Sequence, residues 1–578
     1  MAQNVHYEVF ARSTAKVGWK LVDAKPDRDG ALKYAHALMA EGAAAVRVVK
    51  ETYNDETGDF LTLKIFEDGL VKVKSAPAQE DVPYALPCFR PDDLYSYHAR
   101  LTLARLIPEF LARNKITVIE LLHRADVLEK LEATGTLVQH AIQKIAVAQA
   151  SSTSTPVQQI VKSLNELTTK AFHRVYRDHR AGAFPNVAIS KFGELASKLA
   201  TQSDGLYVLN GAIARVLQGA KGWDEKLVRL LALMDEAPTE GPGGPLLICA
   251  IDAIIAETLS GSAALHELIG AKDNLGASLM SLVELFLGRD PSTVNGERLG
   301  LLALTQRFAA DDLPEARTAI AGRIIAEFKS HKRLCPESLV DEFKTLRAIA
   351  NRVVMGVGKY LSHEDLIAAF TLRSQRLIIH ETLGEYLADA ESSDEKLERL
   401  LFVEENIIGA ENKRQLASFI IPIITATSFE NHFHAAKLPV IARLQRLAQL
   451  NIRVGRSGFQ DIQRSEITER LDRIACDVEA RCKLLDSIAA RHTSHVERAN
   501  TILKLFSAGT FTEGKLSAKA RLLIIDNLSK PGFLTGYVAL ASQGGENKKS
   551  ADAVMAELMQ SLEKIGITEQ TGLKSIAA

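Results

Sequence analysis

Residues 460–506 read QDIQRSEITERLDRIACDVEARCKLLDSIAARHTSHVERANTILKLF, and this stretch has the most regular pattern in the chain. One heptad register holds through it, and neither glycine nor proline interrupts it. Nine of the twelve seam positions are apolar, which is typical of a helix that buries one side along its whole length. We therefore expect one continuous helix, about 65 to 70 Å long at the usual helical rise. The seam positions are Ile467, Leu471, Ile474, Val478, Arg481, Leu485, Ile488, His492, His495, Ala499, Ile502 and Phe506.

The pattern is compatible with two roles for this helix. It is either a coiled-coil element that joins copies of the chain or a partner protein, or a long helix packed inside its own chain. Three polar seam residues, Arg481, His492 and His495, bear on the choice, because polar seam positions can set register and partner number. We take the seam from Ile467 to His495 as candidate interaction residues. His492 and His495 lie on one helical face, but no acidic or cysteine ligand has matching spacing, so we expect no metal there.

Arginines cluster where the chain enters this segment. Residues 440–530 contain 16 Lys and Arg against 10 Asp and Glu, a local excess of six positive charges. Arginine is suited to bidentate contact with carboxylates and phosphates. The cluster is therefore either a docking patch for an acidic partner or a set of ion pairs with the acidic segment Glu391 to Glu405. The candidate residues are Arg443, Arg446, Arg453 and Arg456, with Arg464 beyond them.

The first 76 residues differ from the rest, and we expect them to form a small α+β domain. Residues 5–11, 17–22, 45–52 and 60–66 have strand character, and 27–41 has helical spacing. Residues 54–59 have the composition of a hairpin turn. The order ββαββ predicts an antiparallel sheet with one covering helix. Residues 1–80 hold 11 basic and 12 acidic residues, which gives no electrostatic sign of nucleic-acid binding.

The rest of the chain is expected to be α-helical. A proline-rich linker, 77–92, precedes a helical subdomain at 93–150. Residues 157–450 show helix pairs at intervals of roughly 35 to 45 residues, as in an irregular α-solenoid of HEAT-like type or a helical bundle. The long helix and a helical subdomain would occupy 451–542. Residues 543–578 would be a tether and a last amphipathic helix.

Composition predicts a globular protein of the cytoplasm. The chain has 578 residues, 47% of them hydrophobic and 24% charged, and a net charge of −1. The beginning has no secretory pattern, and the most apolar stretch, Pro245 to Leu259, contains two acidic residues. Five cysteines without a Cys-x-x-Cys pair favour neither disulfides nor a structural zinc site.

Catalytic motifs are missing from the sequence. Residues Gly356 to Lys359 resemble part of a phosphate-binding loop, but Val353 and Tyr360 occupy positions that need glycine and Ser or Thr. His432 and His434 form a weak metal-binding pattern without further ligands. We therefore predict no catalytic residue, no metal and no cofactor, and leave open whether the protein is an enzyme.

Together these features predict a non-enzymatic scaffold or adaptor of the cytoplasm, acting in signalling or assembly. Its partners would be other proteins or a second copy of the chain; nucleic acid is not expected, and neither is a membrane span. The alternative is an all-α ligand sensor or enzyme with its site between helices.

Overall fold

A computed structural model describes residues 5–12, 19–53, 60–69, 86–291, 298–434, 438–542 and 550–568. The chain divides into two compact units. Unit 1 comprises Met1–Thr102 and Thr136–Thr169, and unit 2 comprises Leu103–Gly135 and Lys170–Ala578. Two of the three boundaries fall inside helices, α2 (Tyr97–Leu106) and α7 (Val157–Arg180), so each of these helices contributes to both units.

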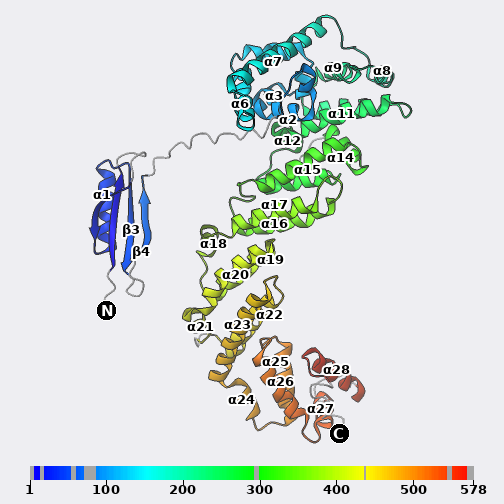
Figure 1. Ribbon diagram of the computed structural model, residues 1–578. Coiled ribbons are helices and arrows are strands. Elements are labelled where there is room, and N and C mark those ends of the chain that lie inside the picture. The colour runs from blue at the N-terminus through cyan, green and yellow to red at the C-terminus, as the bar shows by residue number, and fades with distance from the viewer. Residues whose placement is uncertain are drawn as a thin grey trace. The chain divides into compact units, whose positions relative to one another are not determined.

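The N-terminal part of unit 1 is the predicted ββαββ domain (Figure 1). Its antiparallel sheet has the strand order β2-β1-β3-β4, and the valines Val9, Val46 and Val48 bury one face against α1. Asp27 begins α1 by accepting a hydrogen bond from the backbone N–H of Gly30 at 2.7 Å. The predicted turn at 54–59 lies outside the described residues. The bounds are β1 Val5–Arg12, β2 Lys20–Lys25, α1 Arg28–Ala40, β3 Ala45–Tyr53 and β4 Phe60–Asp68.

All later described elements are helices, as the sequence predicts. They are η1 Pro91–Tyr95, α2 Tyr97–Leu106, α3 Pro108–Asn114, α4 Val118–Leu121, α5 Ala125–Ala133, α6 Leu137–Ser152, α7 Val157–Arg180, η2 Ile189–Lys191, α8 Phe192–Leu199, α9 Gly205–Leu217, α10 Trp223–Asp235, α11 Gly243–Ser260, α12 Ser262–Ile269, α13 Leu275–Phe286, α14 Leu299–Ala309, α15 Pro314–Lys329, α16 Leu339–Val353, η3 Val354–Gly356, α17 His363–Leu377, α18 His380–Leu387, α19 Ser393–Asn406, α20 Ala410–Thr425, α21 Thr427–His434, α22 Val440–Gly455, α23 Asp461–Cys482, α24 Leu484–Ala489, α25 His495–Ser507, α26 Lys515–Leu528, α27 Phe533–Ser542 and α28 Ala551–Lys564.

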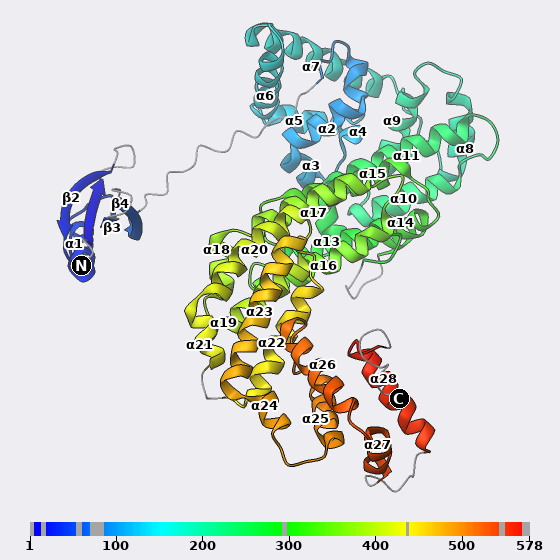
Figure 2. The same cartoon turned by 60° about the horizontal axis from the view of Figure 1, so that its bottom comes forward.

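Two sets of helices in unit 2 pack in chain order (Figure 2). In one set α13, α16, α19 and α22 each contact the next, and in the other α15, α17, α20, α23 and α26 do so. Helix pairs such as α19 with α20 and α22 with α23 join the two sets. The helices α17, α20, α23 and α26 begin 47, 51 and 54 residues apart, a longer spacing than the sequence pattern predicts. Each helix therefore packs mainly against near neighbours in the chain.

Helix α11 is the centre of the N-terminal half of unit 2. Among the described residues it is the one helix whose length and composition would allow it to cross a membrane, but 67% of that apolar segment is buried inside the protein. It contacts α8, α9, α10, α12 and α15. Its hydrophobicity is accounted for by these contacts on several sides.

The prediction of one continuous helix over 460–506 is wrong, because the structure has three helices there. Helix α23 ends where Lys483 adopts a left-handed conformation with φ 47°. The buried Glu479 accepts a hydrogen bond from the backbone N–H of Leu485 at 3.1 Å, which anchors the start of α24. Helix α25 begins at a capping box, in which Ser494 and Glu497 each accept the other's backbone N–H at 3.2 and 3.0 Å. Capping at this point favours a new helix start over continuation.

The C-terminal helix α28 docks on its own chain. Its apolar face, Val554, Leu558 and Leu562, is buried, and α28 packs against α27. The side chain of Arg521 also donates a hydrogen bond to the carbonyl of Ile565 at 2.6 Å. Most of the predicted tether, residues 543–549, lies outside the described part of the chain.

Candidate interaction surface

The predicted arginine cluster meets a row of carboxylates where α19 packs against α22. Helix α19 begins at Ser392, whose hydroxyl accepts the backbone N–H of Glu395. From this start, the helical period places Asp394, Glu398 and Glu405 along one side. Helix α22 presents Arg446 and Arg453, seven residues apart, on the facing side.

These side chains form a continuous series of ion pairs, which we call the α19–α22 ladder. Arg446 donates to Asp394 at 2.9 Å and to Glu398 at 2.5 Å. Arg453 lies 3.4 Å from Glu398 and 2.9 Å from Glu405. The arginine nearer the C-terminus of α22 pairs with the carboxylates nearer the C-terminus of α19, so the two helices run parallel. Glu398 bridges both arginines.

His432 extends the ladder at the Asp394 end. Its Nε2 lies 3.0 Å from Asp394 Oδ1, so this residue of the weak His-x-His motif faces a carboxylate. Its neighbour Phe433 is buried in the core. Over the described residues, no three His, Cys, Asp or Glu side chains are grouped closely enough to hold a metal ion.

Hydrogen bonds lower the pKa of two carboxylates of the ladder, Asp394 and Glu398. Burial alone would raise the pKa of Asp394, but hydrogen bonds from Ser392 and Arg446 outweigh it, so the pKa is lowered. The hydrogen bond from Arg446 is the main cause that lowers the pKa of Glu398. Both carboxylates are therefore charged at neutral pH.

A hollow of about 290 Å³ opens beside the ladder. It is lined by Glu398, Arg446, Gln449, Leu450, Ile452 and Arg453. The arginine side chains remain 29% exposed, and that of Glu398 remains 42% exposed. Partial exposure lets a carboxylate from outside reach the same guanidinium groups. Leu450 and Ile452 of α22 give the hollow an apolar wall.

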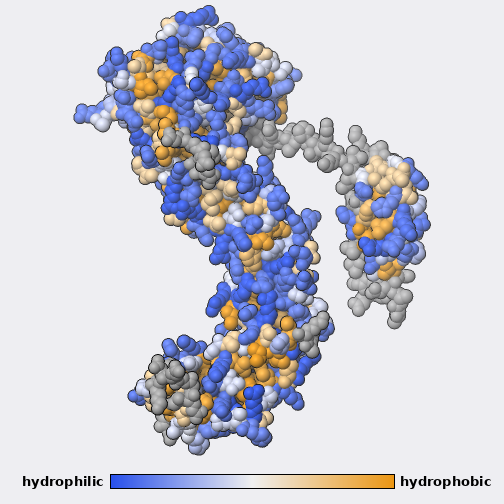
Figure 3. Space-filling model, turned by 180° about the vertical axis from the view of Figure 1, so that it is seen from behind, coloured by the Kyte–Doolittle hydropathy of each residue, from blue (hydrophilic) through white to orange (hydrophobic). Residues whose placement is uncertain are grey.

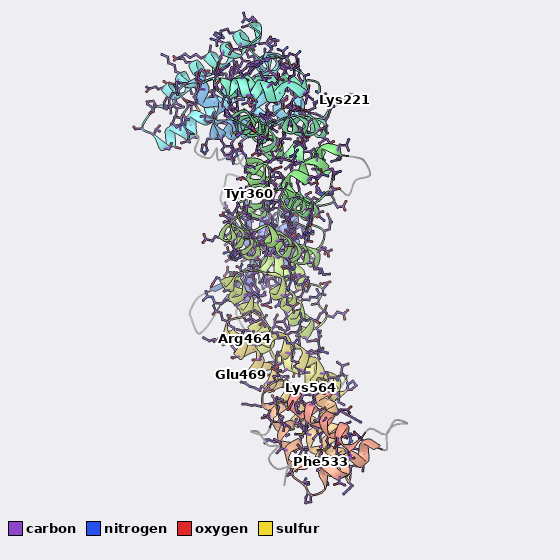
Figure 4. All side chains as sticks on the ribbon, turned by 90° about the vertical axis from the view of Figure 1, so that its right-hand side faces the viewer. Lys221, Tyr360, Arg464, Glu469, Phe533 and Lys564 are labelled. Atoms are coloured by element: carbon purple, nitrogen blue, oxygen red, sulfur yellow. The ribbon has the colours of Figure 1, made fainter. Side chains whose placement is uncertain are left out.

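The other two predicted arginines do not belong to the ladder. Arg443 is buried and donates to the carbonyl of Phe433 at 2.9 Å. Arg456 is exposed just beyond the end of α22. The sequence alternative in which the arginines pair with residues 391–405 is thus confirmed for Arg446 and Arg453. Arg464 pairs with Asp461 on α23, where Arg464 and Glu469 lie at the surface of the helix (Figure 4).

The predicted seam lies inside unit 2. Its apolar residues are nearly inaccessible, from Ile467 on α23 to Ile488 on α24, and they join the main hydrophobic core. The chain therefore covers the seam itself, as in the second interpretation of the heptad pattern. Of the polar seam positions, Arg481 and His492 are exposed, whereas His495 is half-buried with its ring 5.9 Å from that of Phe533.

Buried polar side chains join helices that pack together in unit 2, and they were not predicted from the sequence. Asp472 on α23 accepts from the backbone N–H of Lys515 at 2.6 Å and of Leu516 at 3.3 Å, and so caps α26. Asp252 on α11 caps α15 in the same way, with 2.8 Å contacts to two N–H groups. Burial raises the pKa of Asp252, although these two hydrogen bonds oppose the shift. An acidic residue within an apolar helix is the signal that could have identified this cap.

Hydrophobic residues interrupt the hydrophilic surface in separate patches on the side of the molecule shown in Figure 3.

Comparisons of the whole chain found no matching protein family, curated protein or solved structure. The geometry of these surfaces is therefore the basis for any functional conclusion.

Proposed function

We propose that this chain is a non-enzymatic scaffold or adaptor of the cytoplasm, and that the α19–α22 ladder is a docking surface for an acidic segment of a partner protein. The observation that carries the proposal is the partly exposed pair Arg446 and Arg453 beside a hollow. Each guanidinium can exchange a carboxylate of its own chain for one from a partner, because both offer the same bidentate geometry.

The packing of unit 2 supports a scaffold role. Helices that contact mainly their neighbours in the chain are the hallmark of solenoid arrays, which present extended binding surfaces. We accordingly infer that the two chain-ordered helix sets form an irregular α-solenoid. In such an array the ladder is one position on a surface that continues over successive helix pairs.

Charge replacement tests the docking surface. We would immobilise the wild-type chain and the variant Arg446→Gln/Arg453→Gln, and compare by quantitative mass spectrometry the proteins each retains from its native lysate. The expected result is that at least one partner is retained by the wild type and lost from the variant. That partner should also dissociate as salt rises, since exposed ion pairs are screened.

The matched control is Arg414→Gln/Arg464→Gln. These arginines also form surface ion pairs, with Glu411 and Asp461, but they lie on α20 and α23 outside the ladder. The control should retain the partner. Equal retention by wild type, ladder variant and control would contradict the proposal, and so would the absence of any retained partner.

The arginine-lined hollow also favours a second function, recognition of a small anionic ligand, as in a sensor. Native mass spectrometry of the purified chain distinguishes the two. A bound small molecule that is lost in Arg446→Gln/Arg453→Gln would support the sensor, whereas a mass equal to the chain alone would count against it.

A further inference from the structure

A second surface of the molecule, in unit 1, is independent of the ladder. Helices α6 and α7 lie next to each other in both ribbon views (Figure 1, Figure 2) and enclose a groove of about 730 Å³. On the inner side of this hairpin, Ile142, Ala146 and Ile160 are buried in a small hydrophobic cluster. The groove runs beside this cluster, and Val161 borders both.

The centre of the groove is apolar and accessible. Val147 is 52% exposed and Val157 is 39% exposed, and the half-buried Val161 lies one helical turn further along α7. The side chain of Gln139 donates to Asn165 at 3.0 Å and bridges the two helices. Apolar residues exposed next to each other in a groove lose contact with water when another surface covers them, which favours association.

The rim of the groove is polar. Gln143, Gln158 and Asn165 carry amides, which both donate and accept hydrogen bonds, and Lys162 and Glu166 lie one turn apart on α7. Lys162 and Glu166 are exposed, and neither forms an ion pair with the described residues. A rim that carries one lysine and one glutamate can pair with an identical rim in the opposite direction, because each positive charge then meets a negative one. The amides can likewise form hydrogen bonds with the amides of an identical rim.

From this pattern we infer that the α6–α7 groove binds the α6–α7 groove of a second copy of the chain. A two-fold axis through the groove would place Lys162 of each copy against Glu166 of the other, with the valines between them. In such an isologous contact a surface must be complementary to itself, which this arrangement of opposite charges, amides and valines satisfies. Four helices would then surround one apolar centre, as in a four-helix bundle.

The contact is small, and we expect a reversible dimer. Two helices of this length offer less than the roughly 800 Å² per partner of a standard interface. The oligomeric state should therefore depend on concentration. Sedimentation velocity of the full chain over about a hundredfold range of concentration should show a monomer–dimer equilibrium.

The first variant is Val147→Asp, which places a charge in the centre of the groove. Because the side chain is half exposed, the fold should be retained, and circular dichroism checks this. The dimer should weaken by about tenfold or more in dissociation constant. Val228→Asp is the matched control, since Val228 is a 38% exposed valine on α10 outside the groove, and it should leave the dimer unchanged.

Charge exchange tests the two-fold arrangement directly. Lys162→Glu gives a rim with two acidic residues, and Glu166→Lys gives a rim with two basic residues, so each variant alone should dimerise more weakly than wild type. An equimolar mixture should form a heterodimer, because the acidic rim of one variant faces the basic rim of the other.

Several results would overturn the inference. These are a wild type that stays monomeric over the whole range, a dimer unaffected by Val147→Asp, and a mixture of the two charge variants that does not associate. The ladder variant Arg446→Gln/Arg453→Gln should dimerise like wild type, so this test and that of the proposed docking surface can fail separately.

Discussion

Unit 2 uses ion pairs in two ways, and the contrast lies in burial. Glu342 and Arg373 are a buried pair at 3.4 Å, with side chains 0% and 4% exposed. The α19–α22 ladder has similar chemistry, but its arginine side chains are 29% exposed. A buried charge has no water to replace a lost partner, whereas an exposed one does. The buried pair therefore acts as a structural cross-link, whereas the ion pairs of the ladder are in contact with solvent.

The largest expected effect comes from breaking the buried pair. Arg373 donates to the carbonyls of Glu327, Phe328 and Lys332 as well as to Glu342. Arg373→Met removes the positive charge beside the buried Glu342 carboxylate, which keeps the N–H of Cys335, and removes the donor of several carbonyls. It should destabilise unit 2 by about 3 to 5 kcal/mol. Urea unfolding followed by circular dichroism measures this. Arg373→Met/Glu342→Gln should recover part of the loss, and an equal loss in both variants would contradict the assignment.

A buried histidine gives the next largest effect, as a dependence on pH. Burial of His123 lowers its pKa from 6.5 to about 4, although a hydrogen bond with the carbonyl of Ile119 opposes the shift. His123 therefore binds a proton more readily in the unfolded chain than in the folded chain. Its contribution to the free energy of unfolding is full above pH 6.5 and is lost as the pH falls toward 4. The loss should approach about 3 kcal/mol.

Unfolding midpoints measured across this pH range test the assignment to His123. His123→Gln should be less stable than wild type at pH 7 but should lose less stability between pH 6.5 and 4. An identical pH dependence in both proteins would show that another group is responsible.

Removal of a helix cap should have an intermediate effect. Asp472→Ala deletes the acceptor for two backbone N–H groups of α26 and for the hydroxyl of Thr512. Unit 2 should lose about 2 kcal/mol, since the N–H of Leu516 and the hydroxyl of Thr512 stay buried. The matched exposed carboxylate is Asp461, and Asp461→Ala should change the urea midpoint little. Similar losses in the two variants would mean that burial does not set the energy of these contacts.

The smallest effect is expected at the ladder. Arg446→Gln and Arg453→Gln should each reduce the free energy of unfolding by less than about 1 kcal/mol, because exposed ion pairs are screened and solvated. Thermal unfolding at low and high salt checks this, with a smaller difference between variant and wild type at high salt. A loss as large as that of Arg373→Met would mean that the ladder is a structural element and not a surface available to partners.

The sequence predicted best where local pattern and fold agree. The alternation of Val, Ile and polar residues identified three of the four strands closely, and the start of the remaining strand, β2, shifted from 17 to Lys20. The heptad register of 460–506 correctly identified the buried side of the chain, as Ile467, Leu471 and Ile474 show. It did not show that the helix is interrupted. Apolar spacing indicates which side of the segment faces the core, and the same spacing can continue across a short turn between two helices.

One local signal for that break was present. Ser494 and Glu497 have the Ser-x-x-Glu spacing of a capping box, which predicts a helix start. The other break depends on Lys483, whose left-handed conformation has no sequence signature. For the candidate site, the charge count identified Arg446 and Arg453. The acidic segment 391–405 was correctly predicted as the alternative source of their ion-pair partners. The hollow beside them and the α6–α7 groove could not be predicted, because both depend on the spacing of packed helices.

The sequence by itself determined the helical class, the N-terminal ββαββ domain and the apolar faces of most helices, because these follow from periodicity and local capping. Only the tertiary structure decided that the heptad seam is covered by its own chain, and which carboxylates cap or pair across helices. It also decided which valines remain accessible in the α6–α7 groove. The physical reason is that burial and ion pairing depend on which distant segments approach each other, and residue spacing along one helix carries no record of that approach.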